Sequence, residues 1–294
     1  MVHKDWIEEM VINKLGNNIT KIDIKTKDVT LLLLSDVHFD SKSCERELLK
    51  STLDKALEKN AIILVNGDFF DMMQSKSDRR HMKGAIRKEY LGDNYFDLVI
   101  EDAYEFLKPY AKNILVMADG NHETAITKNY ETNPLERLCY MLRKEGGSNT
   151  QHTGYQGWVV LSFNNNGQRA AFYIKMHHGS GGNARVTKGI IEHNRMSTYV
   201  EGADLIWLGH THTQYCVHST IEKITSSNVY DVHLHTVYHV RTGCWKQGYK
   251  ANGWEVEKGF NPSEIGGYWV ELLHSRKRLD GKKKTQIQTK VYST

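Results

Sequence analysis

The 294-residue sequence lacks the features of several protein classes. No apolar run approaches the roughly 18 residues of a membrane-spanning helix, and the first residues, MVHKDWIEEM, lack the apolar core of a signal peptide. We therefore expect a cytoplasmic protein with no membrane partner. The four cysteines form no CxxC pair, which indicates reduced thiols and argues against a disulfide framework or a zinc knot. They are Cys44, Cys139, Cys216 and Cys244.

Proline and net charge are also scarce. The chain has three prolines and no low-complexity segment, so we find no linker and predict a single domain over residues 1–294. A formal net charge of +4 is mild and does not by itself indicate a nucleic-acid partner. With 39% hydrophobic and 25% charged residues, the composition is that of a globular protein with a sizeable core.

Histidines, by contrast, are abundant, with 15 in the chain. Leu31–Leu34 is a run of four leucines, which is typical of a strand buried on both faces. Asp36 and His38 follow where this strand ends, and residues two apart in an extended chain point the same way. One oxygen and one nitrogen ligand suit a metal such as Mn, Fe or Zn. Because ligand sites lie beyond the carboxyl ends of strands in α/β sheets, this is a candidate metal position.

The same arrangement recurs along the chain. Each further cluster of polar side chains directly follows an apolar segment that we expect to be a strand. One such cluster alone is typical of an ordinary turn or loop, but five clusters at the carboxyl ends of strands indicate a common site. The four further clusters are Asp68 with Asp71 after residues 61–65, Asn121 with His122 after 114–118, His178 after 170–177, and His210 with His212 after 204–208.

Apolar periodicity predicts the elements between these clusters. The first half alternates strands and helices, which implies a largely parallel sheet. Later strands form hairpins, one at an Asn-Gly pair that ends at Gly167 and one around residues 280–281. We expect the strands from about residue 214 onward to complete a second sheet. The expected helices span residues 5–15, 43–59 with Ser43 as the cap, 93–110, 134–144 and 184–200.

In order, the clusters read Asp-x-His, Gly-Asp-x-x-Asp, Gly-Asn-His-Glu, His-Gly and Gly-His-Thr-His, from Asp36 to His212. This series resembles the calcineurin-like metallophosphoesterase superfamily. The resemblance implies an α/β fold, a four-layer α/β/β/α sandwich of two packed mixed sheets, with a dinuclear metal site at the strand ends. More loosely, residues 72–91 and 259–267 are similar to stand-alone enzymes of this superfamily from bacteriophages and prophages.

The resemblance also implies which side chains hold the two divalent metal ions. Manganese is the ion that we favour, and Fe, Zn, Ni, Co and Mg stay open as alternatives. At the His-His pair, alternation along the strand and the family's His-Gly order both select His178 over His177. In this assignment one ion is held by Asp36, His38 and His212, the other by Asn121, His178 and His210, and Asp68 bridges both.

For the reaction, the resemblance implies a metal-dependent phosphoric ester hydrolase. A phosphodiester or phosphomonoester would be cleaved by in-line attack of a hydroxide that bridges the two metals. His122 would protonate the leaving oxygen as the general acid. Asp71 would orient the His122 ring and favour its protonated form.

These motifs leave the substrate undetermined. The basic segment 78–90, DRRHMKGAIRKEY, follows Asp71 closely and would bring Arg79 and Arg80 to the rim of the site as tentative substrate-binding residues. A solvated helix face is the alternative interpretation of this segment. We favour an anionic phosphodiester or nucleotide over a neutral monoester. Two other functions stay open: a DNA exonuclease, because GDFFD resembles a motif of the repair-nuclease branch, and a non-catalytic binding scaffold.

Overall fold

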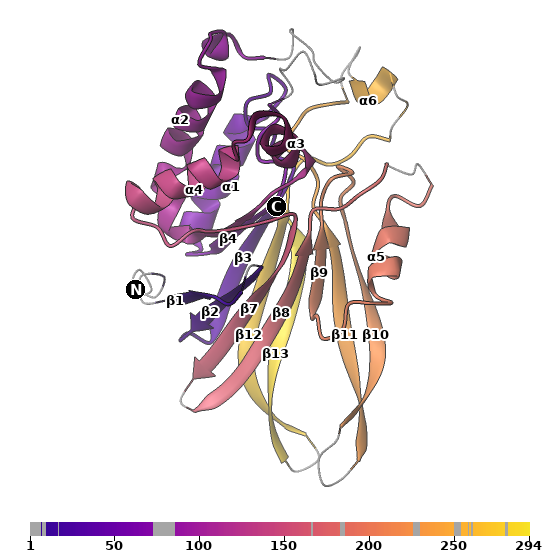
Figure 1. Ribbon diagram of the computed structural model, residues 1–294. Helices are drawn as coiled ribbons and strands as arrows, with labels where there is room; N and C mark the ends of the chain where they lie inside the picture. The colour runs from indigo at the N-terminus through magenta and orange to yellow at the C-terminus, as the bar shows by residue number, and fades with distance from the viewer. Residues whose placement is uncertain are drawn as a thin grey trace.

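The computed structural model describes residues 7, 10–16, 18–72, 86–165, 167–182, 186–225, 230–249, 254–257, 259, 261–279 and 282–294. Two β-sheets pack face to face, with helices on their outer faces (Figure 1). The fold is therefore an α/β sandwich of two mixed sheets with flanking helices, which confirms the predicted fold class. No helix in the described ranges is long and apolar enough to cross a membrane.

The first sheet has six strands in the order β13-β12-β3-β4-β5-β6. The strands from β3 to β6 are parallel, as the alternation of strands and helices predicted. Two long antiparallel strands, β12 and β13, extend the sheet beyond β3. The bounds are β3 (Asp28–Leu34), β4 (Ile62–Asn66), β5 (Ile114–Ala118), β6 (Gln151–Thr153), β12 (Tyr268–Leu279) and β13 (Lys282–Ser293).

The second sheet has seven strands in the order β1-β2-β7-β8-β9-β11-β10. The hairpin of β7 and β8 is antiparallel, as predicted, and β9 runs parallel to both β8 and β11. The bounds are β1 (Val11–Lys14), β2 (Ile19–Ile24), β7 (Gln156–Asn165), β8 (Gln168–His177), β9 (Leu205–Leu208), β10 (Tyr215–Thr225) and β11 (Asp231–Arg241).

The helices are distributed unequally between the two outer faces (Figure 1). Most of the described helices lie beside the six-stranded sheet, whereas α5 lies against the seven-stranded sheet. The bounds are α1 (Arg46–Glu58), α2 (Tyr95–Leu107), α3 (Asn121–Tyr130), α4 (Pro134–Lys144), α5 (Ile190–Met196) and α6 (Trp254–Glu257), with 3-10 turns at η2 (Lys88–Tyr90) and η3 (Lys108–Asn113).

The side chains of β3 show how the layers are held together. Leu32 and Leu34 pack into the cluster under the helices, whereas Leu31 and Leu33 pack between the two sheets. The leucine run is thus buried on both faces because alternate residues enter different cores. A third, smaller cluster joins Met196 of α5 to the outer face of β9 and β11. Three apolar interfaces therefore separate four layers, as the predicted α/β/β/α sandwich requires.

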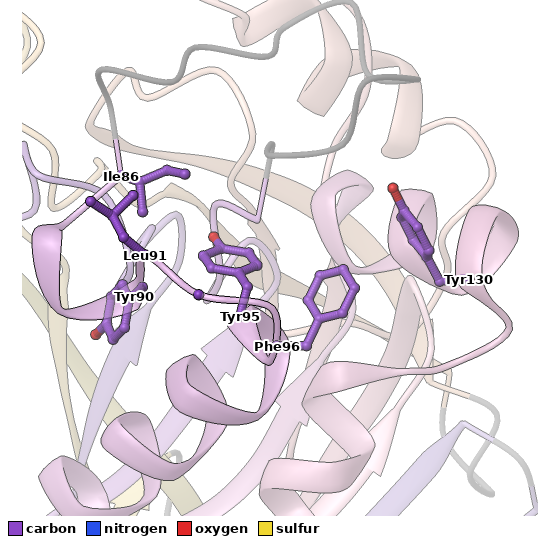
Figure 2. A pocket seen from close by; sticks show the side chains of 7 residues that line it. Ile86, Tyr90, Leu91, Tyr95, Phe96 and Tyr130 are labelled. Atoms are coloured by element: carbon purple, nitrogen blue, oxygen red, sulfur yellow. The ribbon is translucent and has the colours of Figure 1, made fainter.

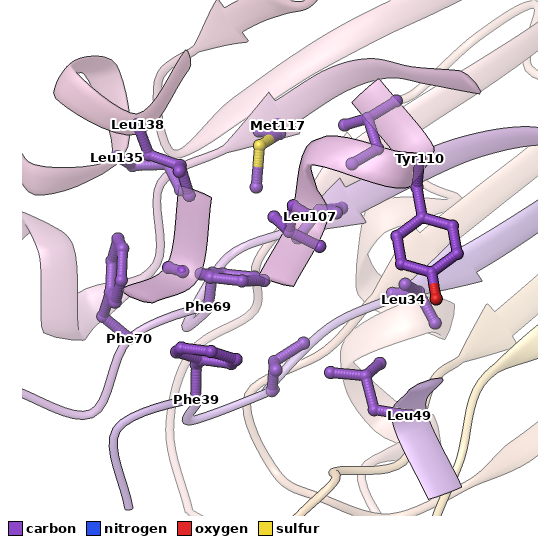
Figure 3. Close-up of a cluster of buried hydrophobic side chains, with 14 of the residues drawn as sticks. Leu34, Phe39, Leu49, Phe69, Phe70, Leu107, Tyr110, Met117, Leu135 and Leu138 are labelled. Atoms are coloured by element: carbon purple, nitrogen blue, oxygen red, sulfur yellow. The ribbon is translucent and has the colours of Figure 1, made fainter. Parts of the chain in front are cut away.

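Aromatic residues anchor the loops after β3 and β4 in the core under the helices (Figure 3). Phe39 and Phe69 stack with their ring centroids 5.6 Å apart, and Phe70 contacts Phe69 edge-on. All three rings are essentially inaccessible to solvent. Because each ring directly follows a loop that carries predicted ligands, burial of the rings fixes where those loops lie.

Some sequence predictions of individual elements are wrong. Val11–Lys14 is a strand paired with β2, not the second half of a helix, and Gly16 lies in the turn between these strands. The apolar residues of segment 5–15 have a helical spacing, and this spacing does not reveal that part of the segment pairs with β2. Helix α1 begins at Arg46 with Glu45 at the N-cap position, so Ser43 is not the cap. The Ser43 carbonyl instead accepts from the amide of Gln247 in another segment. Of the helix expected over 184–200, the structure describes residues 186–200, and in that range the α-helix is α5.

The C-terminal strands also differ from the prediction that they complete only the second sheet. Strands β10 and β11 join the seven-stranded sheet, and β12 and β13 join the six-stranded one. The Asn66 side chain ties the sheets together at one edge, where its amide donates to the carbonyls of His177 (3.0 Å) and Trp207 (3.2 Å). The carboxyl ends of β4, β8 and β9 therefore meet at this edge.

Candidate metal centre

The predicted ligands converge at the edge where these strands end, although residues 36 and 212 are far apart in the sequence. In each of two groups, three side chains bring ligand atoms within 4.8 Å of one another. All members of both groups are predicted ligands. The first group is Asp36, His38 and His212, and the second is Asp68, His178 and His210.

In the first group, two imidazoles face each other. His38 Nε2 lies 3.1 Å from His212 Nε2, and His212 Nε2 lies 3.5 Å from Asp36 Oδ1. Asp36 and His38 are buried, while the His212 side chain keeps 21% of its surface exposed. The three ligand atoms therefore surround one small volume that has access to solvent at His212.

In the second group, Asn121 joins the ligands. His178 Nε2 lies 3.1 Å from Asp68 Oδ2 and 3.3 Å from Asn121 Oδ1. His210 Nδ1 lies 2.7 Å from the same Asn121 oxygen. His178 is fully buried, whereas the half-buried His177 accepts a hydrogen bond from the Gly179 amide. The structure thus brings His178, and not His177, to Asp68.

Asp68 lies between the two groups. Its carboxylate belongs to the second group and also to a cluster with His38 and His122 in which the ligand atoms lie within 4.8 Å of one another. A buried carboxylate with imidazoles from both groups around it is placed as the predicted bridging ligand would be.

The donor atoms fit a pair of transition-metal ions. Metal–nitrogen and metal–oxygen bonds of about 2.0–2.2 Å place the ligand atoms of one ion at most about 4.4 Å apart. The ligand atoms of both groups lie close to this range. Mixed imidazole, carboxylate and amide donors suit ions such as Mn, Fe or Zn. The buried histidine and aspartate clusters are therefore compatible with a dinuclear metal site.

The backbone is strained at the same positions. Five predicted ligands have positive φ angles: Asp36 (51°), His38 (49°), Asp68 (48°), His210 (71°) and His212 (57°). Positive φ is uncommon for residues other than glycine and costs on the order of 1–3 kcal/mol each. Such residues cluster at functional sites because the surrounding structure holds them in place. At these five positions, the strained backbone conformation occurs in residues whose side chains converge on the candidate metal centre.

Two glycines of the motifs are required by close packing. A Cβ atom on Gly67 would lie 2.3 Å from His178 Nδ1, and one on Gly120 would lie 2.1 Å from Asp68 Oδ1. Gly67 also has a φ of 83°, which side chains disfavour. The Gly-Asp and Gly-Asn-His motifs therefore need glycine because ligands from other loops pass directly over the backbone.

A sequence model of the calcineurin-like phosphoesterase family matches residues 29–214, the part of the chain that carries all the predicted ligands. The chain belongs to this family.

Other comparisons include two solved structures that are distantly similar to this chain. No curated protein matches its sequence. Among solved structures, GAP50, the anchor in the inner membrane complex of Plasmodium, is 14% identical with a TM-score of 0.44, over 91% of this chain and 85% of GAP50. The Thermotoga maritima protein TM1076 is 16% identical with a TM-score of 0.31, over 89% of this chain and 99% of TM1076. Likenesses this distant say nothing of the substrate.

In three of the predicted ligand histidines, the second ring nitrogen lies close to an oxygen atom of the protein. His38 Nδ1 lies 2.8 Å from Asp71 Oδ1, and His178 Nδ1 lies 2.8 Å from the Asn66 carbonyl. His210 Nε2 lies 2.9 Å from the Gly181 carbonyl. Partners of this kind fix the tautomer and the ring orientation of metal-binding histidines. They leave His38 Nε2, His178 Nε2 and His210 Nδ1 directed at the centre.

The arrangement around Asp71 differs from the predicted one. Its carboxylate lies 2.8 Å from His38 Nδ1 but 3.8 Å from His122 Nδ1. The close partner of His122 Nδ1 is the Asp71 backbone carbonyl, at 2.5 Å. His122 Nε2 lies 3.7 Å from Asp68 Oδ2 and so faces the predicted bridging ligand. Asp71 therefore holds His122 through its backbone and His38 through its side chain.

Burial and charge shift the pKa values in the site. Burial, followed by the charge of Lys246, lowers the pKa of His38 to about 4 and keeps its ring neutral, as a metal ligand must be. Burial alone would raise the pKa of Asp71, but Lys246 and His38 hold it below its usual range. Burial alone would lower the pKa of His178, but the Asp68 charge raises it to about 9. A cation bound between His178 and Asp68 would therefore displace a proton.

Two structural residues of the site were missed from the sequence. Glu123 is fully buried and accepts hydrogen bonds from the amides of Gly120 (2.8 Å), Asp68 (3.0 Å) and Phe70 (3.0 Å). It therefore holds the loops after β4 and β5 together. Asn66 supports His178 through its carbonyl. The Glu of the Gly-Asn-His-Glu motif was the available signal for Glu123, but its three partners are visible only in the structure.

Two cationic residues near the site come from the end of β11. Arg241 is fully buried and donates to the Gly209 carbonyl (2.6 Å) and to Thr211 Oγ1 (2.8 Å), which steadies the loop that carries His210. Lys246 Nζ lies 3.1 Å from Asp71 Oδ1. Strands after about residue 214 were predicted, but not that β11 runs parallel to β9 and so ends beside the predicted ligands.

The tentative substrate-binding residues Arg79 and Arg80 lie outside the described residues. Of the same basic segment, Arg87 donates to the carbonyls of Ser41 (3.1 Å) and Cys44 (3.2 Å). Arg87 thus ties the segment to the loop before α1. The Arg87 guanidinium therefore donates to backbone carbonyls of the protein itself.

An apolar hollow of about 300 Å³ lies at the start of α2, lined mostly by aromatic rings (Figure 2). The hydroxyl of Tyr95, one of its lining residues, donates to Asp40 Oδ2 at 2.5 Å. Asp40 in turn accepts from the amides of Asp71 (2.6 Å) and Met72 (3.0 Å). The hollow is therefore connected to the metal centre through one buried carboxylate. Its lining residues are Ile86, Tyr90, Leu91, Gly92, Tyr95, Phe96 and Tyr130.

Proposed function

We propose that the protein is a dinuclear metal-dependent phosphoesterase that hydrolyses a phosphodiester or a phosphomonoester. The observation that carries the proposal is the convergence of the two groups of buried ligands on Asp68, within a chain of the calcineurin-like phosphoesterase family. Two bound ions would supply the nucleophile from water and neutralise the phosphoryl oxygens. Manganese is the ion that we favour for both positions, because the ligands mix imidazole with oxygen donors.

The residues of the chain would bind the two ions and supply the general acid. Asp36, His38 and His212 would hold one ion, and Asp68 would set the distance to the second. His122 acts as the general acid, because its Nδ1 is fixed by the Asp71 carbonyl and its Nε2 faces Asp68 at 3.7 Å. A proton on Nε2 is then directed to the place where a leaving oxygen would depart. Asn121, His178 and His210 would hold the second ion.

For the substrate, we propose an anionic phosphodiester or a nucleotide-type ester over a neutral monoester. The support is the positive charge that the sequence places after Asp71 and the ammonium of Lys246 beside the Asp71 carboxylate. Positive charge at the rim of a site raises the local concentration of anionic substrates.

A metal-by-substrate screen tests this function. The protein would be loaded with Mn, Mg, Zn, Co or Ni and offered aryl monoesters, aryl diesters, cyclic nucleotides and labelled DNA. We expect hydrolysis that requires metal, is lost on chelation and is fastest on a diester. Full activity in excess chelator would contradict the two-metal proposal.

The same screen decides between the alternatives. Degradation of labelled DNA that weakens steeply with salt would support the exonuclease, because salt competes with phosphate contacts. A protein that binds two ions per chain but cleaves none of the substrates would support the non-catalytic scaffold. No described residue favours either alternative over the phosphoesterase.

A further inference from the structure

The segment after β11 forms part of the wall of the metal centre. Because β11 runs parallel to β9, its carboxyl end emerges at the edge where the ligands lie. The Trp245 amide donates to the Asp36 carbonyl at 3.0 Å, and the Gln247 amide donates to the Ser43 carbonyl at 2.8 Å. Trp245 itself is fully buried. The backbone on both sides of Lys246 is therefore fixed against the loop that carries the first ligands.

The side chain of Lys246 reaches from this fixed backbone into the site. Its Nζ lies 3.1 Å from Asp71 Oδ1, the same oxygen that lies 2.8 Å from His38 Nδ1. One carboxylate and one imidazole thus separate the ammonium from the ligand atom His38 Nε2. The Lys246 side chain keeps 21% of its surface exposed, whereas that of Asp71 keeps 4%. The ammonium therefore lies between a buried carboxylate and solvent.

The chemistry of this position suits an anionic ligand. An ammonium group has three donors, and Asp71 Oδ1 can accept only part of what they offer. A lysine near a phosphate acts as a point charge and needs no fixed orientation. The Lys246 ammonium would therefore add positive charge for an anionic ligand beside that of the two proposed ions.

We propose that Lys246 is an anion-binding residue of the site, and that its ammonium contacts a non-bridging oxygen of the substrate phosphoryl group while Asp71 holds it in place. The proposal rests on the proposed phosphoesterase function. It adds a substrate contact from outside residues 29–214, the part of the chain that the family match covers. A role limited to neutralising Asp71 is the competing explanation, and the two differ in what they predict for phosphate binding.

The experiment measures inorganic phosphate binding by titration calorimetry on manganese-loaded protein, together with the number of bound ions and the steady-state kinetics on an aryl diester. Lys246→Met removes the charge and keeps the length of the side chain. Lys246→Arg restores the charge. Lys50→Met is the matched control, because Lys50 pairs with Asp54 on the exposed face of α1. Lys246→Gln replaces the methionine variant if that variant does not fold.

We expect Lys246→Met to weaken phosphate affinity and raise KM about 10- to 100-fold, with the metal content unchanged, as for loss of a charge-assisted hydrogen bond. Lys246→Arg should recover most of the affinity, and Lys50→Met should match the parent. Unchanged phosphate affinity in Lys246→Met, loss of metal in that variant, or a parent that binds no phosphate would each overturn the proposal. If the parent protein hydrolyses esters and Lys246→Met has the same phosphate affinity and KM as the parent, this inference alone is disproved. If the parent protein shows no metal-dependent hydrolysis, the proposed function is disproved.

Discussion

The two halves of the proposed metal centre are supported in different ways. In the half with Asp36 and His212, the second nitrogen of His38 faces the Asp71 carboxylate, which is in turn met by Lys246. In the other half, the second nitrogens of His178 and His210 face backbone carbonyls. One half thus has a carboxylate side chain beside its ligand histidine, and the other has backbone carbonyls.

This difference decides in which half a single substitution can remove the group that supports a ligand histidine. Support by a side chain is removed by one mutation, whereas support by a carbonyl is lost only if the fold changes. The first half is therefore the one in which metal affinity is set by residues outside the ligand set. The predictions below separate the two halves, from the largest expected effect to the smallest.

Asp68→Asn should affect both halves at once. The amide is neutral and cannot bridge two cations, so we expect loss of both ions and a fall in hydrolysis on the order of 10³-fold, since bound ions supply several kcal/mol of charge stabilisation. Elemental analysis and kinetics check this. Asp119→Asn, at a buried carboxylate that bonds Asn133 and His152, is the control. Full double occupancy in Asp68→Asn would refute the bridging role.

His122→Ala should leave both halves loaded with metal and still slow the reaction. The loss should be roughly 10²–10⁴-fold for poor leaving groups and much smaller for nitrophenolate, which departs without a proton. Rates for a series of aryl esters with different leaving-group pKa values measure this. An equal loss along the whole series would contradict the role of His122 as the general acid.

Asp71→Asn should separate the halves. Loss of the carboxylate on His38 should weaken the first ion about 10–100-fold and leave the second unchanged. His210→Ala should do the reverse, because His210 belongs to the other half. Stepwise metal titration of the two variants gives the comparison. A leaving-group dependence like that of His122→Ala would instead support the orienting role that the sequence suggested for Asp71.

Glu123→Ala should weaken both halves equally and mildly. Glu123 joins the loops after β4 and β5 by accepting from three amides. Each of the three buried donors left unpaired costs about 1–3 kcal/mol, so we expect the free energy of unfolding in urea to fall by several kcal/mol. The loss of affinity should be small and similar for the two ions. Selective loss of one ion would show that Glu123 serves only one half.

That most of the predicted ligands gather at one edge could be foreseen from the sequence, because these residues lie in short, local patterns. Asp36 and His38 follow a leucine run, and His210 and His212 follow the apolar segment of β9. A strand end is visible in sequence as a switch from apolar to polar residues, and parallel strands end at one edge. The choice of His178 over His177 followed from strand alternation and from the family's His-Gly order, and the structure brings His178 to Asp68.

The partners of those residues could not be predicted in the same way. The sequence assigned Asp71 to His122 by resemblance, yet its carboxylate lies nearer His38. Oxygen-to-nitrogen distances of this kind depend on how two loops pack, and packing here is set by rings such as Phe39 and Phe69 in the core. The N-terminal strand β1 was missed for a similar reason. It is a strand because it pairs with β2, and the spacing of its own apolar residues does not show this pairing.

By itself, the sequence determined the layered α/β class and the edge at which polar clusters gather, since both follow from local periodicity and from where apolar runs stop. Only the tertiary structure decided which side chains meet across loops and that β11 ends at the same edge, bringing Arg241 and Lys246 to the site. Strand direction within a sheet arises from long-range pairing, and no stretch of the chain records it locally.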